Sequence, residues 1–573
     1  MDDRLLEDYL QELRWLRAAS GEFSRQHPKI AARLRLSEFD CPDPHVERLL
    51  EGFALQSARL NQRLDEGFSE LSESLLELLT PHLLRPYPSF ATARFTSDPL
   101  ASDLTQGYSL PAGTPLYALT AEGETVWWRT ALQHTLWPVA IDDLAWLDAS
   151  AARQASGLSQ ARGALSLRLR CLPPWQFSTL TMRTLRIYLG GAPQINATLF
   201  DLLYAHAIGP QRPQPVGLEN AEHLLASEPG VESSGLALSA WMHCPQALMY
   251  FDLPIPQTQH GDTMTLCIPF RRAPDTALHL TRDDVRLDCI PVVNLFTRTS
   301  EPLPVGHTHS EYRLVADLYD KEMQIYRIVQ LWMSRRDEAW PVPPYYGAQQ
   351  HADARWFWHA RRHYRQENDL WLTLVDSRFD PFAADEEATL TATLLCTNGE
   401  CASSLMAGTP LAFDFPGPIA QVCLLGTPTD PGQSVRQRNA RWKLVSSLVL
   451  NHVSLTEGDE ALESLKEMLS LYASSGESAA VWQQIDGIRA MRCERASEHS
   501  GRDAWRGWRN GIRVTLTLDP QAFTASSRLL FAAIIARFLA HNATANCFVH
   551  TVLQDDSEEI LLWRDADPTR PIV

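Results

Sequence analysis

The sequence has no long apolar run. Its longest apolar stretch, at residues 529–540, is interrupted by Arg537 and is shorter than the roughly 20 residues that a helix needs to cross a bilayer. Residues 1–20 carry acidic and basic side chains throughout, whereas a secretory signal requires an uninterrupted apolar core. We therefore predict a buried helix at residues 529–540 and a cytoplasmic location for the protein.

Clustered cysteines and an excess of positive charge are also missing. The ten cysteines are scattered and no C-x-x-C pair occurs, so we expect reduced thiols that are buried as small apolar side chains. The formal net charge is −18, with 51 Lys and Arg against 69 Asp and Glu. Binding to nucleic acid or to anionic lipid needs clustered positive charge. The sequence therefore predicts protein partners and no nucleic acid.

Signatures of catalysis are absent as well. The chain has neither the G-x-x-x-x-G-K-[ST] nor the G-x-G-x-x-G loop that cradles phosphates, and Gly190 and Gly191 are predicted to form a turn. The nucleophile elbow G-x-S-x-G does not occur. We predict that the protein is not an enzyme and needs no cofactor. A Ser-His-Asp triad assembled from distant segments leaves no local signature, so a hydrolase with a dispersed active site in the β-rich middle stays as the alternative.

The nearest approach to a metal site is the pair His359 and His363. On a helix, two histidines four residues apart can bind one ion. The zinc-protease pattern also needs Glu after the first histidine, where this chain has Ala360, and the two arginines that follow oppose a dication. We predict a basic helix face here and no metal site. Asp376 and Asp380 are a candidate pair of carboxylates, but the surrounding letters favour a turn at a strand end.

What the sequence does have begins with a helical N-terminal region. Leu6, Tyr9, Leu13 and Leu16 recur at steps of three and four residues and form one apolar stripe, with charged residues on the other face. This stripe is our candidate partner interface, because the apolar stripe of a helix can dock into a groove of another chain. The alternative is that it packs on the protein's own second and third helices. The sequence alone leaves both open.

Two more helices are expected before residue 90. The second begins at Asp43, which can cap a helix, and Pro44, which suits a first helical turn. A third helix covers residues 71–79, and the proline-rich residues 81–89 cannot remain helical. The apolar residues of the second helix are predicted to form its buried stripe: Val46, Leu49, Leu50, Phe53, Leu60 and Leu64.

From about residue 91 the pattern changes to short alternating strands bounded by Gly, Pro and Asn. A helix is predicted at residues 197–207, and loops at residues 148–160 and 211–234. From residue 441 helices and strands alternate, with residues 447–455 as an ambiguous first strand. This order is similar to the ferredoxin-like β-α-β-β-α-β succession.

The predicted fold class is therefore α+β with several domains. They are an N-terminal helical bundle or partner-binding region at residues 1–90, two β-rich domains at 91–240 and 241–440, and a mixed α/β domain at 441–573 with a ferredoxin-like order of elements.

Tryptophan is abundant, with 17 residues. Several stand beside another aromatic residue or an arginine: Trp127 and Trp128, Trp356 and Trp358, Trp505 and Trp508. Tryptophan and arginine are enriched at protein–protein hot spots, but tryptophan also fills the cores of large β-rich domains. We favour the core interpretation and keep the other open.

The sequence also contains several blocks whose order of residues is specific enough to compare with a known family. The N-terminal blocks are LLEDYLQELRWLRAASGEFSRQHPKIAARLRL and CPDPHVERLLEGFALQSARLNQRLDEGFSELSESLLELLTPHLLRPYPS. The later blocks are VVNLFTRTSEP, SEYRLVADLY, LLCTNGE, WKLVSSLVLNHVSL, RGWRNGIRVTLTLD and FAAIIARFLAHNATANCF. Together, in this order, they resemble the TssF family of bacterial type VI secretion. Residues 148–160 and 211–234 match nothing in that family pattern and are expected to be variable surface loops.

The resemblance implies a role that composition and spacing do not. It implies a structural wedge subunit of the secretion baseplate, similar to the wedge proteins of contractile phage tails. Its partners would be TssG, TssK through TssG, further copies of itself, TssE and the VgrG spike. The baseplate would sit at the cytoplasmic face of the inner membrane, with membrane contact only through the membrane complex. It would serve there as the platform on which the tail tube and sheath polymerise.

Overall fold

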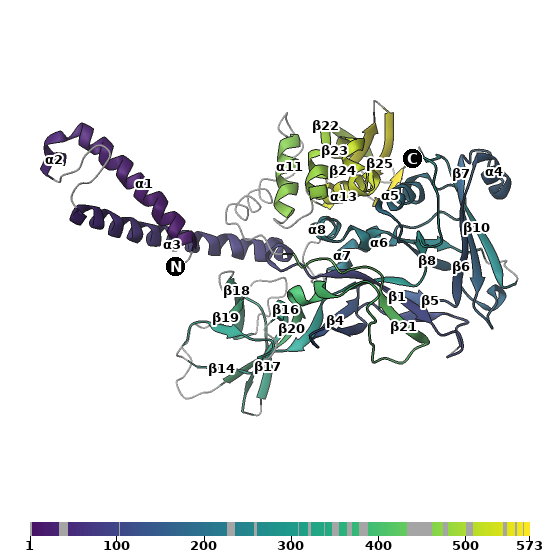
Figure 1. Ribbon diagram of the computed structural model, residues 1–573, viewed down its shortest axis with the longest axis horizontal. Coiled ribbons are helices and arrows are strands. Elements are labelled where there is room, and N and C mark those ends of the chain that lie inside the picture. Colours follow the sequence, from purple (N-terminus) through teal and green to yellow (C-terminus); the bar gives the residue numbers. More distant parts are fainter. Residues whose placement is uncertain are drawn as a thin grey trace. The chain divides into compact units, whose positions relative to one another are not determined.

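In the computed structural model (Figure 1) the chain forms two compact units, unit 1 (Met1–Glu77) and unit 2 (Leu78–Val573). The structure describes residues 3–33, 44–101, 103–225, 235–256, 261–274, 276–306, 309–318, 322–336, 338–345, 354–363, 369–376, 388–432, 461–473, 479–499, 508–541, 547–555, 558–564 and 567–572. Helices and many strands occur together, which confirms the α+β class. No helix within these residues is long and apolar enough to cross a membrane.

Unit 1 is helical, with α1 (Asp3–Gln26), α2 (Pro28–Arg33) and most of α3 (Pro44–Leu79). The predicted helix start at Pro44 is confirmed, whereas Asp43 lies outside the described residues. The prediction of a separate helix at residues 71–79 was wrong, because α3 continues through that range. Its interior has no proline, and a glycine inside a helix costs only about 1 kcal/mol, which a helix of 36 residues tolerates.

The proline-rich residues 81–89 are buried in unit 2. They begin with a short 3-10 helix, η1 (Pro81–Leu84), and lead into strand β1 (Phe90–Ser97). Proline at the start of η1 sacrifices no hydrogen bond, because the first N–H groups of a helix have no partner within it. The α-helix therefore ends where predicted, and the segment that follows is part of the unit 2 interior.

A five-stranded antiparallel sheet, which we call the core sheet, holds unit 2 together. Its order is β21 (Ile419–Leu424), β1, β12 (Cys289–Val293), β4 (Thr125–Thr130) and β3 (Pro115–Leu119). A separate ribbon pairs β2 (Tyr108–Leu110) with β5 (His134–Leu136). Strands from the predicted domains 91–240 and 241–440 thus share one sheet and one apolar core.

Two three-stranded sheets also combine strands from both sides of residue 240. One has the order β10 (Thr263–Phe270), β7 (Gly163–Cys171), β6 (Val139–Leu147), and the other has β11 (Val285–Arg286), β8 (Thr184–Leu189), β9 (Tyr250–Pro254). The predicted loop at residues 148–160 is largely a helix, α4 (Ala149–Ser156). The side chain of Asp148 caps it by accepting from the N–H groups of Ser150 and Ala151, and Gly157 ends it at φ 71°.

Further helices lie between β8 and β9. The predicted helix at residues 197–207 is confirmed, beginning earlier as α5 (Pro193–Asp201) and ending in a π-helical turn (Leu202–His206). The predicted loop at residues 211–234 contains α6 (Val216–Glu219) and α7 (Ala221–Leu224), and its residues 226–234 lie outside the described part. Helix α8 (Leu236–His243) follows and is buried along almost its whole length, because it is apolar on every side.

Residues 296–397 contain a β-sandwich, which we call the inserted sandwich. One sheet has the order β13 (Phe296–Thr299), β20 (Ala388–Thr397), β16 (Gln324–Arg335), β17 (Glu338–Val342), and β14 (Leu303–Val305) also pairs with β20. The other sheet has β15 (Tyr312–Leu314), β19 (Asp369–Asp376) and β18 (Trp356–His363). Both sheets contribute to a single apolar core. A 3-10 helix, η5 (Gly399–Ser404), follows β20.

Adjacent tryptophans on β4 serve two different cores. Successive side chains of a strand point to opposite faces. Trp128 is fully buried in the core beneath the core sheet, and Trp127 packs against the core of the inserted sandwich. Trp356 and Trp358 also pack against the sandwich core. The core interpretation therefore holds for these four residues, whereas the side chains of Trp505 and Trp508 lie outside the described part.

The C-terminal part has helices α11 (Ala461–Tyr472), α12 (Ala479–Asp486) and α13 (Arg528–His541). Its sheet follows chain order: β22 (Ile488–His499), β23 (Trp508–Leu518), β24 (Cys547–Asp555), β25 (Glu558–Arg564), β26 (Asp567–Ile572). Helix α13 joins the parallel neighbours β23 and β24, and the other pairs are antiparallel. The described residues thus give α-α-β-β-α-β-β-β. The predicted first strand at residues 447–455 lies outside them, so the ferredoxin-like succession stays a prediction.

Candidate partner interface

Helices α1 and α3 of unit 1 pack against each other as an antiparallel hairpin. The guanidinium of Arg17 donates to the carboxylate of Glu47, and the amide of Asn61 donates to Glu12 at 2.9 Å. Residues earlier in α1 therefore contact residues later in α3. Between these two hydrogen bonds Leu13 is only 7% exposed. Two small side chains on α3 at this level, Ala54 and Ala58, are fully buried.

The structure divides the predicted stripe of α1. Leu13 is buried within unit 1, Tyr9 and Leu16 are half-buried, and Leu6 is 42% exposed. Leu13 thus contributes to packing inside the hairpin, as the alternative interpretation expected. The other three residues keep surface that a partner chain can cover. Their contact with a partner stays a prediction.

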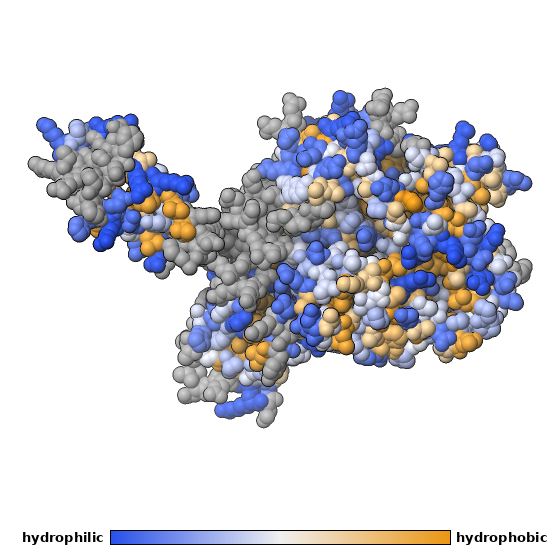
Figure 2. Space-filling model, in the orientation of Figure 1, coloured by the Kyte–Doolittle hydropathy of each residue, from blue (hydrophilic) through white to orange (hydrophobic). Residues whose placement is uncertain are grey.

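A second apolar stripe lies on α3 and faces solvent. Leu49, Phe53 and Leu60 are 73%, 62% and 59% exposed. At about 100° per residue, these three lie within about 40° of one another, on a side of the helix away from Ala54 and Ala58. The prediction that they form a buried stripe was therefore wrong. Figure 2 shows apolar side chains at the surface of the hairpin among charged ones.

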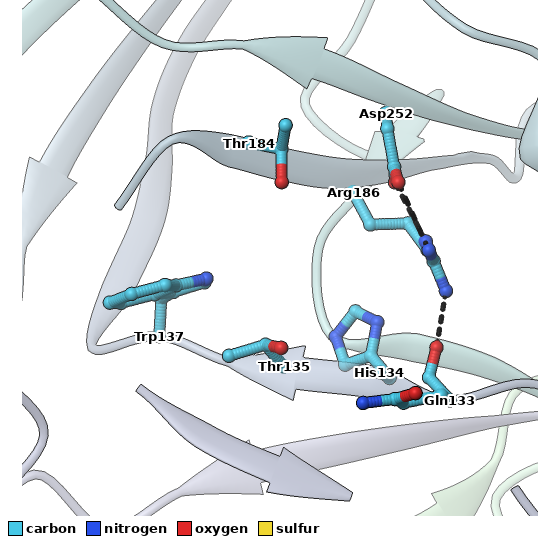
Figure 3. Close-up of a pocket in the computed structure, with 7 residues that line it drawn as sticks. All are labelled: Gln133, His134, Thr135, Trp137, Thr184, Arg186 and Asp252. Atoms are coloured by element: carbon cyan, nitrogen blue, oxygen red, sulfur yellow. Dashed lines mark hydrogen bonds and ion pairs between the residues drawn. The ribbon is translucent and has the colours of Figure 1, made fainter. Parts of the chain in front are cut away.

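A polar pocket of about 230 Å³ in unit 2 bears on the hydrolase alternative (Figure 3). Arg186 from β8 reaches across it, with Nε 2.7 Å and Nη2 3.0 Å from the two carboxylate oxygens of Asp252 on β9. Its Nη1 also donates to the carbonyl of Gln133 at 2.5 Å. Because Asp252 neutralises Arg186, this wall of the pocket presents no free positive charge.

His134 lines the same pocket and is the histidine there that a Ser-His-Asp triad would need. Its Nε2 lies 3.4 Å from Oδ1 of Asp288, a half-buried residue at φ 53°. Burial raises the pKa of the Asp288 carboxyl, although the hydrogen bond from His134 opposes this. The other ring nitrogen, Nδ1, is buried and makes no hydrogen bond within the described residues. A triad needs a nucleophile hydroxyl on that nitrogen, so the geometry around His134 supplies a dyad without a nucleophile.

The other candidates from the sequence do not form a site either. His359 and His363 lie on strand β18, not on a helix, so the prediction of a basic helix face was wrong. Four residues of strand separate their Cα atoms by about 13 Å, which is too far for one ion. Asp376 is buried and pairs with Arg355 at 3.1 Å, and Asp380 lies outside the described residues. Within the described part no group of three metal-ligating side chains occurs.

Comparison with known proteins decides the family. The family model described as "Type VI secretion system, TssF" matches residues 1–567. The chain belongs to the TssF family. The type VI secretion system component TssF1 of Pseudomonas aeruginosa is 28% identical to it over 620 aligned residues, which cover 100% of both proteins. This TssF chain is therefore a component of the type VI secretion system.

Two solved structures have the same fold as this TssF chain. A chain of a TssK-TssF-TssG baseplate subcomplex has a TM-score of 0.71 and 23% identity, covering 92% of this chain and 100% of that one. A chain of a type VI secretion baseplate complex has a TM-score of 0.57 and 21% identity, covering 96% of each. The fold likeness thus extends over nearly the whole protein.

Two of the TssF-like sequence blocks meet in space. VVNLF contributes Asn294 and LLCTNGE contributes Asn398, and the side-chain amide of Asn294 donates to Oδ1 of Asn398 at 2.9 Å. Both side chains are buried. These two residues of the TssF-like blocks therefore stabilise the fold of the TssF protein, since a buried amide needs a hydrogen-bond partner of matching geometry.

Proposed function

We propose that this TssF chain is a structural wedge subunit of the type VI secretion baseplate and acts without catalysis. The family match over residues 1–567 carries the proposal. The fold likeness to a protein solved within a TssK-TssF-TssG subcomplex supports TssG-like and TssK-like partners. Further copies of this chain, a TssE-like subunit and a VgrG-like spike complete the proposed surroundings. They form a platform for the tail tube and sheath at the cytoplasmic face of the inner membrane.

The exposed stripe on α3 is the surface that we propose for the TssG-like partner. Large apolar side chains that gather on one exposed face indicate a binding surface. Covering a Leu or Phe side chain contributes roughly 1.5–3 kcal/mol. Leu49, Phe53 and Leu60 project from one side of α3, and Leu6, Tyr9 and Leu16 of α1 keep partly open surface. Leu13 serves a different purpose in this proposal, because it holds the two helices together.

Co-expression with the TssG-like protein of the same organism, followed by native mass spectrometry, tests the proposal. We expect a defined complex with more than one copy of this chain per TssG-like partner. Leu49→Asp places a charge in the stripe, and we expect affinity for the partner to fall by about 10-fold or more, the equivalent of about 1.4 kcal/mol. Leu100→Asp is the matched control, because Leu100 is 79% exposed but belongs to unit 2.

Three outcomes separate the parts of the proposal. Loss of the complex with Leu49→Asp but not with Leu100→Asp, at unchanged thermal unfolding, supports the α3 stripe. Equal effects of the two substitutions contradict it. A folded wild-type chain that ignores the TssG-like protein contradicts the wedge role itself. Leu13→Asp gives a further comparison. A charge at this buried position should unfold the hairpin, so any loss of binding should follow from the lost packing of α1 on α3.

A further inference from the structure

The inserted sandwich is joined to the core sheet through two asparagines. The chain leaves the core sheet at the end of β12, passes Asn294, and enters the sandwich at β13. It leaves the sandwich at the end of β20, passes Asn398, and returns through η5, where Ala402 packs in the core beneath the core sheet. Both chain crossings therefore take place at one point.

The two asparagines bond each other and the strand between them. Nδ2 of Asn294 donates to the carbonyl of Trp127 at 2.6 Å and to Oδ1 of Asn398 at 2.9 Å. Its Oδ1 accepts from the hydroxyl of Thr397 at 2.6 Å and from the backbone N–H of Asn398 at 2.8 Å. All four hydrogen bonds available to the Asn294 amide are thus made.

Asn398 completes the connection to β4. Its Oδ1 also accepts from the backbone N–H of Trp127 at 2.9 Å, and its Nδ2 donates to the carbonyl of Thr125 at 3.2 Å. The indole of Trp127 points into the sandwich, with its ring centre 6.3 Å from that of Phe296 and the guanidinium of Arg298 5.0 Å from it. One residue of the core sheet therefore binds both asparagines by its backbone and the sandwich by its side chain.

The burial of this group makes its geometry strict. Asn294 and Asn398 are 0% and 3% exposed. A buried amide cannot exchange its partners for water, so rotating the sandwich relative to the core sheet leaves donors and acceptors unpaired. Contacts elsewhere, such as the guanidinium of Arg85 over the ring of Tyr326 at 5.5 Å, attach the sandwich without prescribing an angle to the same degree.

We propose that Asn294, Asn398 and Trp127 form a rigid joint that holds the inserted sandwich at one orientation on the core sheet, and that assembly of the baseplate depends on this orientation. The first half concerns the isolated chain, whereas the second half rests on the proposed wedge function. The joint acts through matched hydrogen-bond donors and acceptors. Replacing one side-chain NH₂ group by an oxygen can therefore disturb it, which would not be so for a covalent linker.

Two substitutions that exchange NH₂ for an oxygen test the joint. Asn294→Asp removes both donations of Asn294 and places a carboxylate against two acceptor oxygens, those of Trp127 and Asn398. Asn398→Asp replaces the longer bond to Thr125 by a carboxylate oxygen set against that one carbonyl, and it keeps an acceptor for Trp127 and Asn294. The same change should therefore be more severe at Asn294, where two bonds are lost and two acceptors are opposed, than at Asn398. Thr397→Val, which removes one bond to Asn294, is a gentler variant should Asn294→Asp not fold.

Electron–electron distance measurements on the full chain report the orientation directly. Spin labels are introduced as non-natural amino acids at Leu119 on β3 and Val329 on β16, both exposed. We expect one narrow distance peak for wild type and Asn398→Asp, and a broad or shifted distribution for Asn294→Asp or Thr397→Val. A narrow, unshifted peak in a folded Asn294→Asp or Thr397→Val chain overturns the joint.

Binding of the TssG-like partner by the same variants tests the second half. Loss of the complex together with a broadened distance distribution supports it. A broadened distribution with an unchanged complex shows that assembly does not depend on the joint, and overturns that half. If wild type itself forms no complex, the wedge function fails while the distance result on the isolated chain still decides the joint.

Discussion

His82 is a titratable residue in the interior of unit 2. Burial, and secondarily the positive charge of Arg85, lowers the pKa of its imidazole from 6.5 to about 3. In the unfolded chain the ring takes up a proton below about pH 6.5, whereas in the folded chain it stays neutral until about pH 3. Protons therefore favour the unfolded state between these values, and the free energy of unfolding falls as the pH falls through that window.

We predict that His82→Phe removes part of the acid sensitivity of the protein. Between pH 6.5 and 4.5 wild type should lose up to about 1.4 kcal/mol per pH unit from this residue, and the variant should not. Urea unfolding at several pH values measures the difference. His279→Phe is the control, because His279 is exposed. Parallel pH profiles for wild type and His82→Phe would show that burial of this ring does not govern its protonation.

Residue patterns identified the apolar faces of strands and helices more reliably than the residues that pack against those faces. The alternation in β4 is consistent with a strand, but nothing local tells that Trp127 and Trp128 face two different cores. The four-residue spacing of His359 and His363 fits one face of a helix and one face of strand β18 equally well. Only the pairing of β18 with β19 decides between the two. Burial depends on partners that lie far away in the sequence.

At the scale of elements, α3 shows why periodicity located a stripe but assigned it to the wrong surroundings. Leu49, Phe53 and Leu60 do share one face of the helix, as predicted. The face that packs on α1 is marked by the small residues Ala54 and Ala58 instead, since small side chains permit close helix packing. A stripe of large apolar residues in an assembly protein need not be buried by its own chain.

Helix α4 carried signals in the sequence that the prediction of a loop overlooked. Asp148 caps its start, and Gly157 ends it at φ 71°, a conformation that costs other residues about 1 kcal/mol or more. We predict that Gly157→Ala lowers the free energy of unfolding by about 1 kcal/mol, since an added Cβ meets no atom within 4 Å and only the backbone is strained.

Thermal unfolding measures this effect, with Gly306→Ala as the matched control. Gly306 likewise has open space around it but does not adopt a positive φ. Alanine there should leave stability unchanged or raise it slightly, because it restricts the unfolded chain. Equal destabilisation by both substitutions would mean that the left-handed conformation of Gly157 is not the cause.

At the scale of the whole molecule, strand pairing over long distances limits what the sequence can reveal. Ala93 of β1 pairs with Leu424 of β21, and β7 pairs with β10 across the residues predicted to separate two domains. Local alternation predicts each strand but contains no record of its neighbours. The functional prediction rested on specific blocks of letters, whereas the residues taken by themselves excluded classes of function without naming one.

The division into two units predicts that binding and stability separate on truncation. Unit 2 (Leu78–Val573) contains the core sheet, the inserted sandwich and the C-terminal sheet, each with apolar side chains of its own to bury. A chain that begins at Leu78 should therefore unfold at nearly the wild-type temperature. Because it lacks α1 and the exposed stripe of α3, it should not form the complex with the TssG-like protein.

Calorimetry and co-purification measure the two properties. Retained binding by the truncated chain would place the principal contact on unit 2, and a cooperative loss of folding would show that the helical hairpin is needed for the stability of the rest.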